Sequence, residues 1–141
     1  MSVPGLFATV PHADYLHFGQ GPNFNPKAVA ELLGLKKQEV SKLAQVAESS
    51  VRYDQDIPHK VRDRLEEIAS VINMVAGAFD GDAPKTVLWF KTSNPMLGDV
   101  TPRDMIRLGR YDKLRKFIVS AAMERGQDRA YANKARRGQA T

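Results

Sequence analysis

In the segment WFKTSNPMLGDVTPRDMIRLGRY, residues 89–111, signals for a helix end, a turn, a proline-started short helix and a glycine stop follow one another. Its Asn94-Pro95 pair predicts a turn, because the residue before a proline is pushed out of the helical region. Gly98 can adopt the positive φ that closes such a turn. The segment therefore predicts a helix that ends just after Trp89 and is followed by a tight turn.

A short second helix is predicted to follow that turn. Thr101 is a favoured N-cap, Pro102 suits the first helical position, and Asp104 gives a capping-box-like start. Gly109 is expected to end the helix. The residues expected to face inward are Met105, Ile106 and Leu108. The residues expected to stay exposed, as a guanidinium cluster suited to carboxylates or phosphates, are Arg103, Arg107 and Arg110.

The rest of the chain predicts an all-α fold. Asn25-Pro26 is a favourable helix start, Gly34 is a helix stop, and Asp82 or a neighbouring residue is expected to cap a later helix. Pro58 begins the longest predicted helix, whose apolar residues form one stripe with helical spacing. These residues are Val61, Leu65, Ile68, Ile72, Val75 and Phe79. Residues 71–79 are apolar nearly all round, so they lie either at the heart of the monomer or in a partner interface.

A helix-turn-helix unit is predicted upstream, in one of two registers. One register uses Ala30, Gly34 and Val40, and the other uses Ser41, Gln45 and Val51. We favour the second, because it leaves residues 26–34 as a supporting helix and puts polar side chains on the reading helix, 48–54. The candidate DNA-binding residues are Lys42, Ser49, Ser50, Arg52 and Tyr53. A plain helical bundle with the same turns is the alternative.

The predicted organisation has four parts: an irregular N-terminal arm (1–24), a helix-turn-helix and dimerisation region (25–80), a small helical domain (81–123) and a flexible basic tail (124–141). The net charge of +5 favours an acidic or polyanionic partner. More than half of this excess lies in the tail, which we expect to be disordered when free. Its basic residues are Arg125, Arg129, Lys134, Arg136 and Arg137.

Several functional classes receive no support from the sequence. There is no cysteine, so no disulfide or thiolate metal site is expected. No glycine-rich phosphate loop, HExxH motif or serine elbow occurs, so we expect a binding protein and not an enzyme, with no cofactor. No apolar run is long enough to span a membrane, and the N-terminus lacks the features of a signal peptide. A cytoplasmic location is expected.

The segment from about Asp82 to Val119 resembles the toxin-binding domain of Xre/MbcA/ParS-type antitoxins. The matching features are the WF pair near a helix end, NPxLG at 94–98, the helix start at Pro102 and the IRLG run at 106–109. The region from about Lys36 to Phe79 is similar to the Xre-like helical part of that family. The N-terminal arm and the basic tail lie outside the resemblance.

The resemblance implies an antitoxin that docks on a RES-domain, NAD-consuming toxin and obstructs its active site. It also implies a homodimer within a larger toxin–antitoxin assembly, and repression of its own operon. The residues that would form the toxin-binding turn and its exposed side are Trp89, Asn94, Pro95, Leu97, Gly98, Arg107, Arg110 and Tyr111. The charge pattern adds Arg103, Lys113 and the five basic residues of the tail.

Two further hypotheses stay open. One is a stand-alone helix-turn-helix regulator, supported by the basic charge and by the ESSVRYD segment (48–54) as a reading helix. The presence of Gln45, where the motif usually has glycine, makes operator binding less secure than toxin binding. The other is an interaction module in which residues 71–79 form a homodimer seam.

Overall fold

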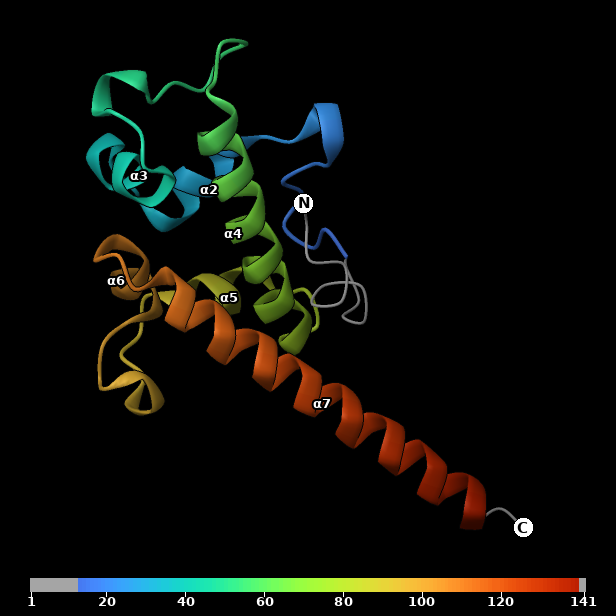
Figure 1. Ribbon diagram of the computed structural model, residues 1–141. Coiled ribbons are helices and arrows are strands. Elements are labelled where there is room, and N and C mark those ends of the chain that lie inside the picture. The colour runs from blue at the N-terminus through green and yellow to red at the C-terminus, as the bar shows by residue number, and fades with distance from the viewer. Residues whose placement is uncertain (1–12, 140–141) are drawn as a thin grey trace.

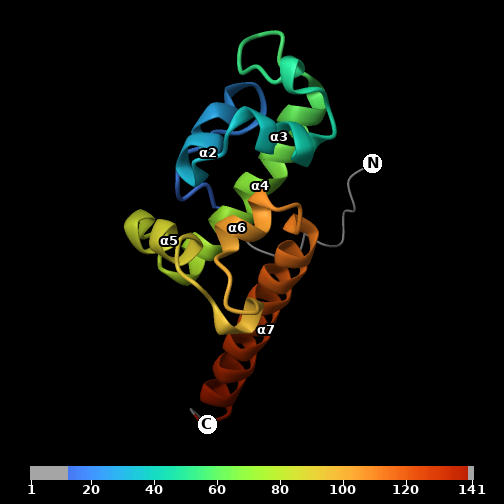
Figure 2. The ribbon, with the colours of Figure 1, turned by 90° about the vertical axis from the view of Figure 1, so that its left-hand side faces the viewer.

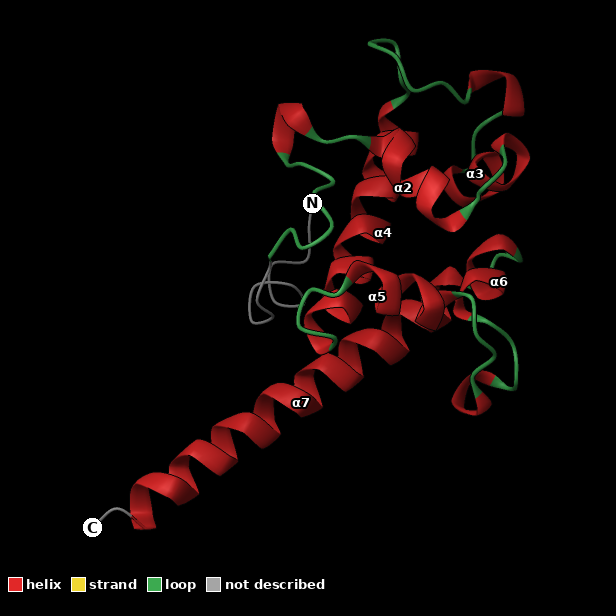
Figure 3. Cartoon of the chain, turned by 180° about the vertical axis from the view of Figure 1, so that it is seen from behind, coloured by secondary structure: helices red, strands yellow, loops and turns green. Residues whose placement is uncertain are grey.

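The computed structural model describes residues 13–139, with side chains as far as Gly126. This range is all-helical and contains no β-strand (Figure 3), which confirms the predicted fold class. Its α-helices are α2 (Pro26–Leu33), α3 (Lys37–Ala44), α4 (His59–Ala78), α5 (Ala83–Phe90), α6 (Pro102–Arg107) and α7 (Tyr111–Gln139). Three 3-10 turns lie between them: η1 (Gly21–Asn23), η2 (Glu48–Ser50) and η3 (Pro95–Leu97).

Helix α4 lies at the centre of the molecule, with α2 and α3 packed along its first half and α5 and α7 against its second half (Figure 1). The predicted apolar stripe explains this position, because Val61, Leu65, Ile68 and Ile72 are all buried. Residues 71–76, apart from the half-buried Asn73, are buried within the monomer. Residues 71–76 are therefore mainly core, whereas Gly77, Ala78 and Phe79 are not fully buried.

Local capping signals set several helix starts as predicted. The side chains of Asn25, Asp82 and Thr101 each accept a hydrogen bond from the backbone N–H three residues ahead. Each oxygen satisfies a donor that the first helical turn leaves unpaired. Gly34, with φ of 62°, ends α2 in the left-handed conformation.

The favoured helix-turn-helix register is wrong. Residues 48–50 form a single 3-10 turn, and no helix covers 51–58. The cause is local: the Asp54 carboxylate accepts a hydrogen bond from the backbone N–H of Asp56 and pairs with Arg52, which favours a turn over a helix. The two consecutive helices are α2 and α3, joined at Gly34, and this matches the secondary structure of the other register.

Residues 13–24 are irregular apart from η1 and are held against α4, while residues 1–12 of the predicted arm lie outside the described range. The Asp14 carboxylate accepts hydrogen bonds from the backbone N–H groups of Phe18 and Gly19. The Asn73 side chain donates to Asp14 and accepts from the backbone N–H of Leu16. One hydrophobic cluster runs from Phe18 to Val119, so the predicted regions 25–80 and 81–123 share a single core.

The longest helix is α7 and not α4. The predicted flexible tail at 124–141 is instead helical as far as Gln139, and residues 140–141 lie outside the described range. Alanine, arginine, lysine and glutamine favour helix, and extending a helix that packing has already nucleated adds one hydrogen bond per residue. The C-terminal part of α7 extends away from the other helices (Figures 1 and 2).

Arg103 joins α6 to the end of α2. Its guanidinium donates to the backbone carbonyls of Leu33 and Gly34, at 3.1 Å for the latter. These carbonyls belong to the last helical turn, which carries partial negative charge and has no intrahelical donors. Arg103 therefore caps α2 from across the molecule.

We expect Arg103→Lys to lower the free energy of unfolding by about 1–3 kcal/mol, because a lysine cannot donate along both directions of the guanidinium fork. Urea unfolding followed by Trp89 fluorescence measures the change. Arg110→Lys is the matched control, since Arg110 is exposed. Equal stability of the two variants would show that the cap contributes nothing.

Candidate functional site

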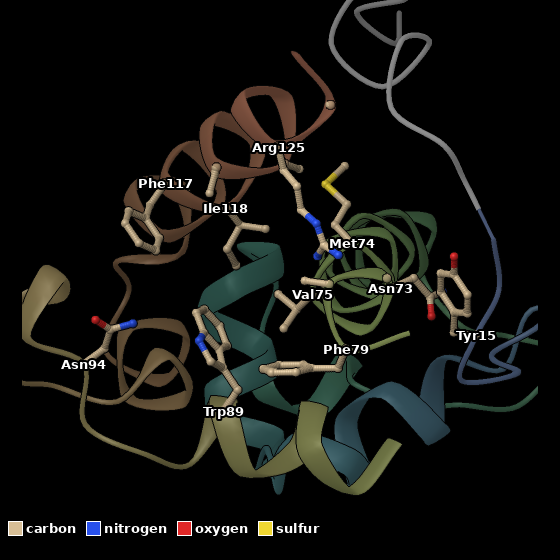
Figure 4. Close-up of a pocket in the computed structure, with 15 residues that line it drawn as sticks. Tyr15, Asn73, Met74, Val75, Phe79, Trp89, Asn94, Phe117, Ile118 and Arg125 are labelled. Carbon is tan, nitrogen blue, oxygen red and sulfur yellow. The ribbon is translucent and has the colours of Figure 1, made fainter. Parts of the chain in front are cut away.

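Three of the predicted toxin-binding residues line one groove. Trp89 comes from α5, Asn94 from the turn that follows it, and Arg125 from α7. The groove has a volume of about 380 Å³, within the range of roughly 300–1,000 Å³ that is common for ligand sites. Figure 4 shows that α7 forms one wall and that the end of α4, with α5, forms the other.

The groove is mainly aromatic and aliphatic. Trp89 and Phe79 lie on one wall, while Phe117 and Ile118 face them from α7 (Figure 4). Trp89 is half-buried and packs edge-on against the buried Phe90, with ring centroids 5.0 Å apart. Trp89 thus packs against the core and leaves part of its surface in the groove.

Small residues make the groove possible, and the sequence analysis did not single them out. Gly77 and Ala78 on α4 face Ala121 and Ala122 on α7 across the same space. A Cβ added at Gly77 would lie 3.3 Å from the ring of Tyr15, so glycine lets this tyrosine approach. The signal that could have found the groove is a run of small residues on two apolar helices.

Hydrogen bonds within the turn at Asn94 hold it closed. The Asn94 side chain accepts a hydrogen bond from the backbone N–H of Met96. Its backbone N–H donates to the Val100 carbonyl at 3.0 Å, and its carbonyl accepts from Asp99 at 3.0 Å. Gly98, with φ of 80°, supplies the predicted positive-φ position. The turn is therefore a preformed loop rather than a flexible one.

This loop presents apolar and polar groups to solvent. Met96 at its tip is 77% exposed, and Pro95 and Gly98 are exposed as well. Leu97 instead packs against the core. Of the NPxLG residues, Asn94 and Leu97 fix the shape of the loop, and the others form its surface.

The predicted cluster of three exposed arginines does not exist. Arg103 caps α2, and Arg107 is held between two carboxylates, at 2.6 Å from Glu39 and 2.6 Å from Asp104. Only Arg110 is exposed. The sequence could not show this, because Glu39 lies 68 residues away from Arg107 along the chain.

Glu39 is the junction between α3 and α6. One carboxylate oxygen accepts the backbone N–H of Lys36 at 2.9 Å, which caps α3, and the other accepts from Arg107. The side chain is only 12% exposed. Burial opposes its ionisation, but the hydrogen bonds from Lys36 and Arg107 outweigh burial, so the pKa of Glu39 is lowered.

Two more residues of the opening segment lie where the sequence did not place them. Tyr111, predicted to be exposed, is buried, and the Arg64 guanidinium lies over its ring at 4.8 Å. Burial, followed by the charge of Glu67, raises the pKa of Tyr111 far above its ordinary range. Leu108, predicted to face inward, is 68% exposed because α6 ends at Arg107. Lys113 is exposed.

The candidate DNA-binding residues do not form a reading helix. Arg52 is paired with Asp54 and lies 3.8 Å from Asp56, so its charge is locally balanced. Tyr53 is half-buried against the core. Lys42 and Ser49 are exposed, and Ser50 is half-buried.

Of the five tail cations, only Arg125 has a described side chain. The other four, Arg129, Lys134, Arg136 and Arg137, lie on the part of α7 beyond Gly126, where only the backbone is described. Where side chains are described, no group of three or more His, Cys, Asp or Glu residues is arranged to hold a metal. None of the described helices combines the length and the apolar character that crossing a membrane requires.

Comparisons with protein-family models, curated proteins and solved structures find no match to this chain. The antitoxin resemblance therefore rests on the residues quoted above, and its functional content enters below as a proposal.

The lowered pKa of Glu39 predicts a specific pH dependence. A carboxylate with a depressed folded-state pKa stabilises the fold above its unfolded pKa of about 4.3, and this contribution disappears as pH falls through the folded value. We expect the melting temperature of wild type to exceed that of Glu39→Gln near neutral pH, and the gap to narrow below about pH 4.3. Thermal melts from pH 7 to pH 3 measure it. A gap that is constant with pH would contradict the assignment.

Proposed function

We propose that this protein is an antitoxin that binds a RES-domain, NAD-consuming toxin and blocks its active site. The observation that carries the proposal is the convergence of Trp89, Asn94 and Arg125 on one half-open apolar groove. Trp89 and Asn94 belong to the segment that resembles the toxin-binding domain of this antitoxin family. A preformed loop beside the groove suits a protein partner, because little ordering entropy is lost on docking.

The projecting part of α7 is our candidate for the blocking element. It extends beyond the helical body (Figure 2) and carries four basic residues after Gly126. A toxin cleft that accepts an anionic dinucleotide has groups that suit negative charge on its substrate. A basic helix placed over that cleft would cover the entrance and exclude the dinucleotide. Docking and blocking would then reside in different parts of the chain.

Co-expression with a RES-domain toxin encoded beside this chain's gene tests the proposal. The full chain should restore growth and cellular NAD, and it should co-purify with the toxin. A chain that ends at Gly126 should still bind, since it keeps the groove and the core, but it should protect less.

Circular dichroism of the shortened chain serves as the folding control. If the full chain neither binds nor protects, the antitoxin proposal is wrong. If the shortened chain protects fully, the projecting helix has no part in the blocking.

Operator binding is a second candidate, supported by the exposed face of α3. Lys37, Gln38 and Lys42 are exposed on this helix, which follows α2 after the Gly34 turn, and Gln45 is exposed at its C-cap. The second helix of a helix-turn-helix lies in the major groove, where lysine and glutamine can contact phosphates and base edges. We propose α3, and not residues 48–54, as the reading helix.

Fluorescence anisotropy with the DNA upstream of the gene checks this candidate. Lys37→Ala and Lys42→Ala should each weaken binding and reduce the salt slope by about 1. Arg52→Ala is the matched control and should bind like wild type. A binding defect in Arg52→Ala as large as in the lysine variants would instead indicate that residues 48–54 contact the DNA. An absence of any shift, with or without the toxin, would exclude operator binding.

A further inference from the structure

The groove has the dimensions of a docking site for a peptide segment. On α7 its lining spans three turns, a length of about 13 Å at the rise of an α-helix. The lining residues on α7 are Phe117, Ile118, Ala121, Ala122, Arg125 and Gly126. A half-open groove between two helices matches the way an amphipathic helix lays its apolar face onto a partner.

The only charge in the lining of the groove is positive. Arg125 is the only charged residue of its lining, which contains no aspartate or glutamate. Figure 4 shows the guanidinium directed back over the groove toward Met74 and Asn73. Arg107 and Arg115, by contrast, lie within 4 Å of carboxylates. Within the part of the chain with described side chains, Arg125 forms no ion pair.

The basic character continues along α7. Arg129 and Arg136 follow Arg125 by four and eleven residues, and the helical repeat places these positions on the same face. This part of α7 lies beyond the other helices (Figure 1). A segment seated in the groove would therefore run from an apolar surface onto a row of basic positions.

We propose that the groove seats an acidic amphipathic segment of the partner protein. Apolar side chains of this segment insert between Trp89 and Phe117, and carboxylates beside them pair with Arg125. This inference rests on the proposed function, because it names the part of the toxin that the antitoxin grips. It adds the location and the chemistry of that contact.

A steric block tests the location. Ala121 is exposed and lines the groove, whereas its neighbour Ser120 is exposed and does not line it. We expect Ala121→Trp to weaken toxin binding on the order of tenfold or more, because the indole fills the space for the segment. Ser120→Trp, the matched control, should bind like wild type. Circular dichroism verifies that both variants fold.

Charge reversal tests the chemistry. Arg125→Glu should weaken toxin binding on the order of tenfold or more, because two carboxylates would then face each other. Lys60→Glu makes the same charge change at an exposed position outside the groove and should bind nearly as well as wild type. Hydrogen exchange of wild type in the complex should show added protection at residues 73–79 and 117–126.

The outcomes separate this inference from the proposed function. If wild type binds no toxin, both are overturned. If wild type binds and Ala121→Trp binds equally well, the groove is not the docking site, while the antitoxin function stands. If Ala121→Trp fails to bind and Arg125→Glu binds normally, the segment is apolar and not acidic, and the proposed chemistry is wrong.

Discussion

The burial of the apolar residues of α4, which form one stripe in its first half and most of residues 71–76, is the constraint on which the rest of this fold depends. A helix with this much apolar surface must be covered from several directions, and short helices can do this by packing against different parts of it. Helices α2 and α3 cover its first half, and α5 and α7 cover its second half. The groove lies where this coverage stops, between the end of α4 and α7, because small residues face each other there.

Polar contacts between segments that are distant in sequence then join α6 to α2 and α3. Arg103 and Arg107, both on α6, reach the end of α2 and the start of α3, respectively. The helix pair that could read DNA and the segment that resembles a toxin-binding domain are thus one body. Of the three arginines predicted to form an exposed cluster, Arg103 and Arg107 are used in these contacts, and the cation that lines the groove is Arg125 on α7.

The sequence predicted what short-range chemistry determines. Caps at Asn25, Asp82 and Thr101 and the turn at Asn94 depend on residues within a few positions, and all were placed correctly. The roles of Arg103 and Arg107 depend on groups 68 or more residues away, which no local pattern reveals. Trp89 and Asn94 could be named as site residues, but the groove that unites them with Arg125 depends on how α4 and α7 pack.

The hydrogen bonds between Asp14, Leu16 and Asn73 have a practical consequence for work with this protein. They position Tyr15, which forms part of the groove lining although it precedes every α-helix of the described range. A few partly buried hydrogen bonds can open at much lower free energy than a helical core. An affinity tag fused upstream is therefore attached to a wall of the groove, and a C-terminal tag is attached to the projecting helix. Binding data from singly tagged protein should be compared between both placements.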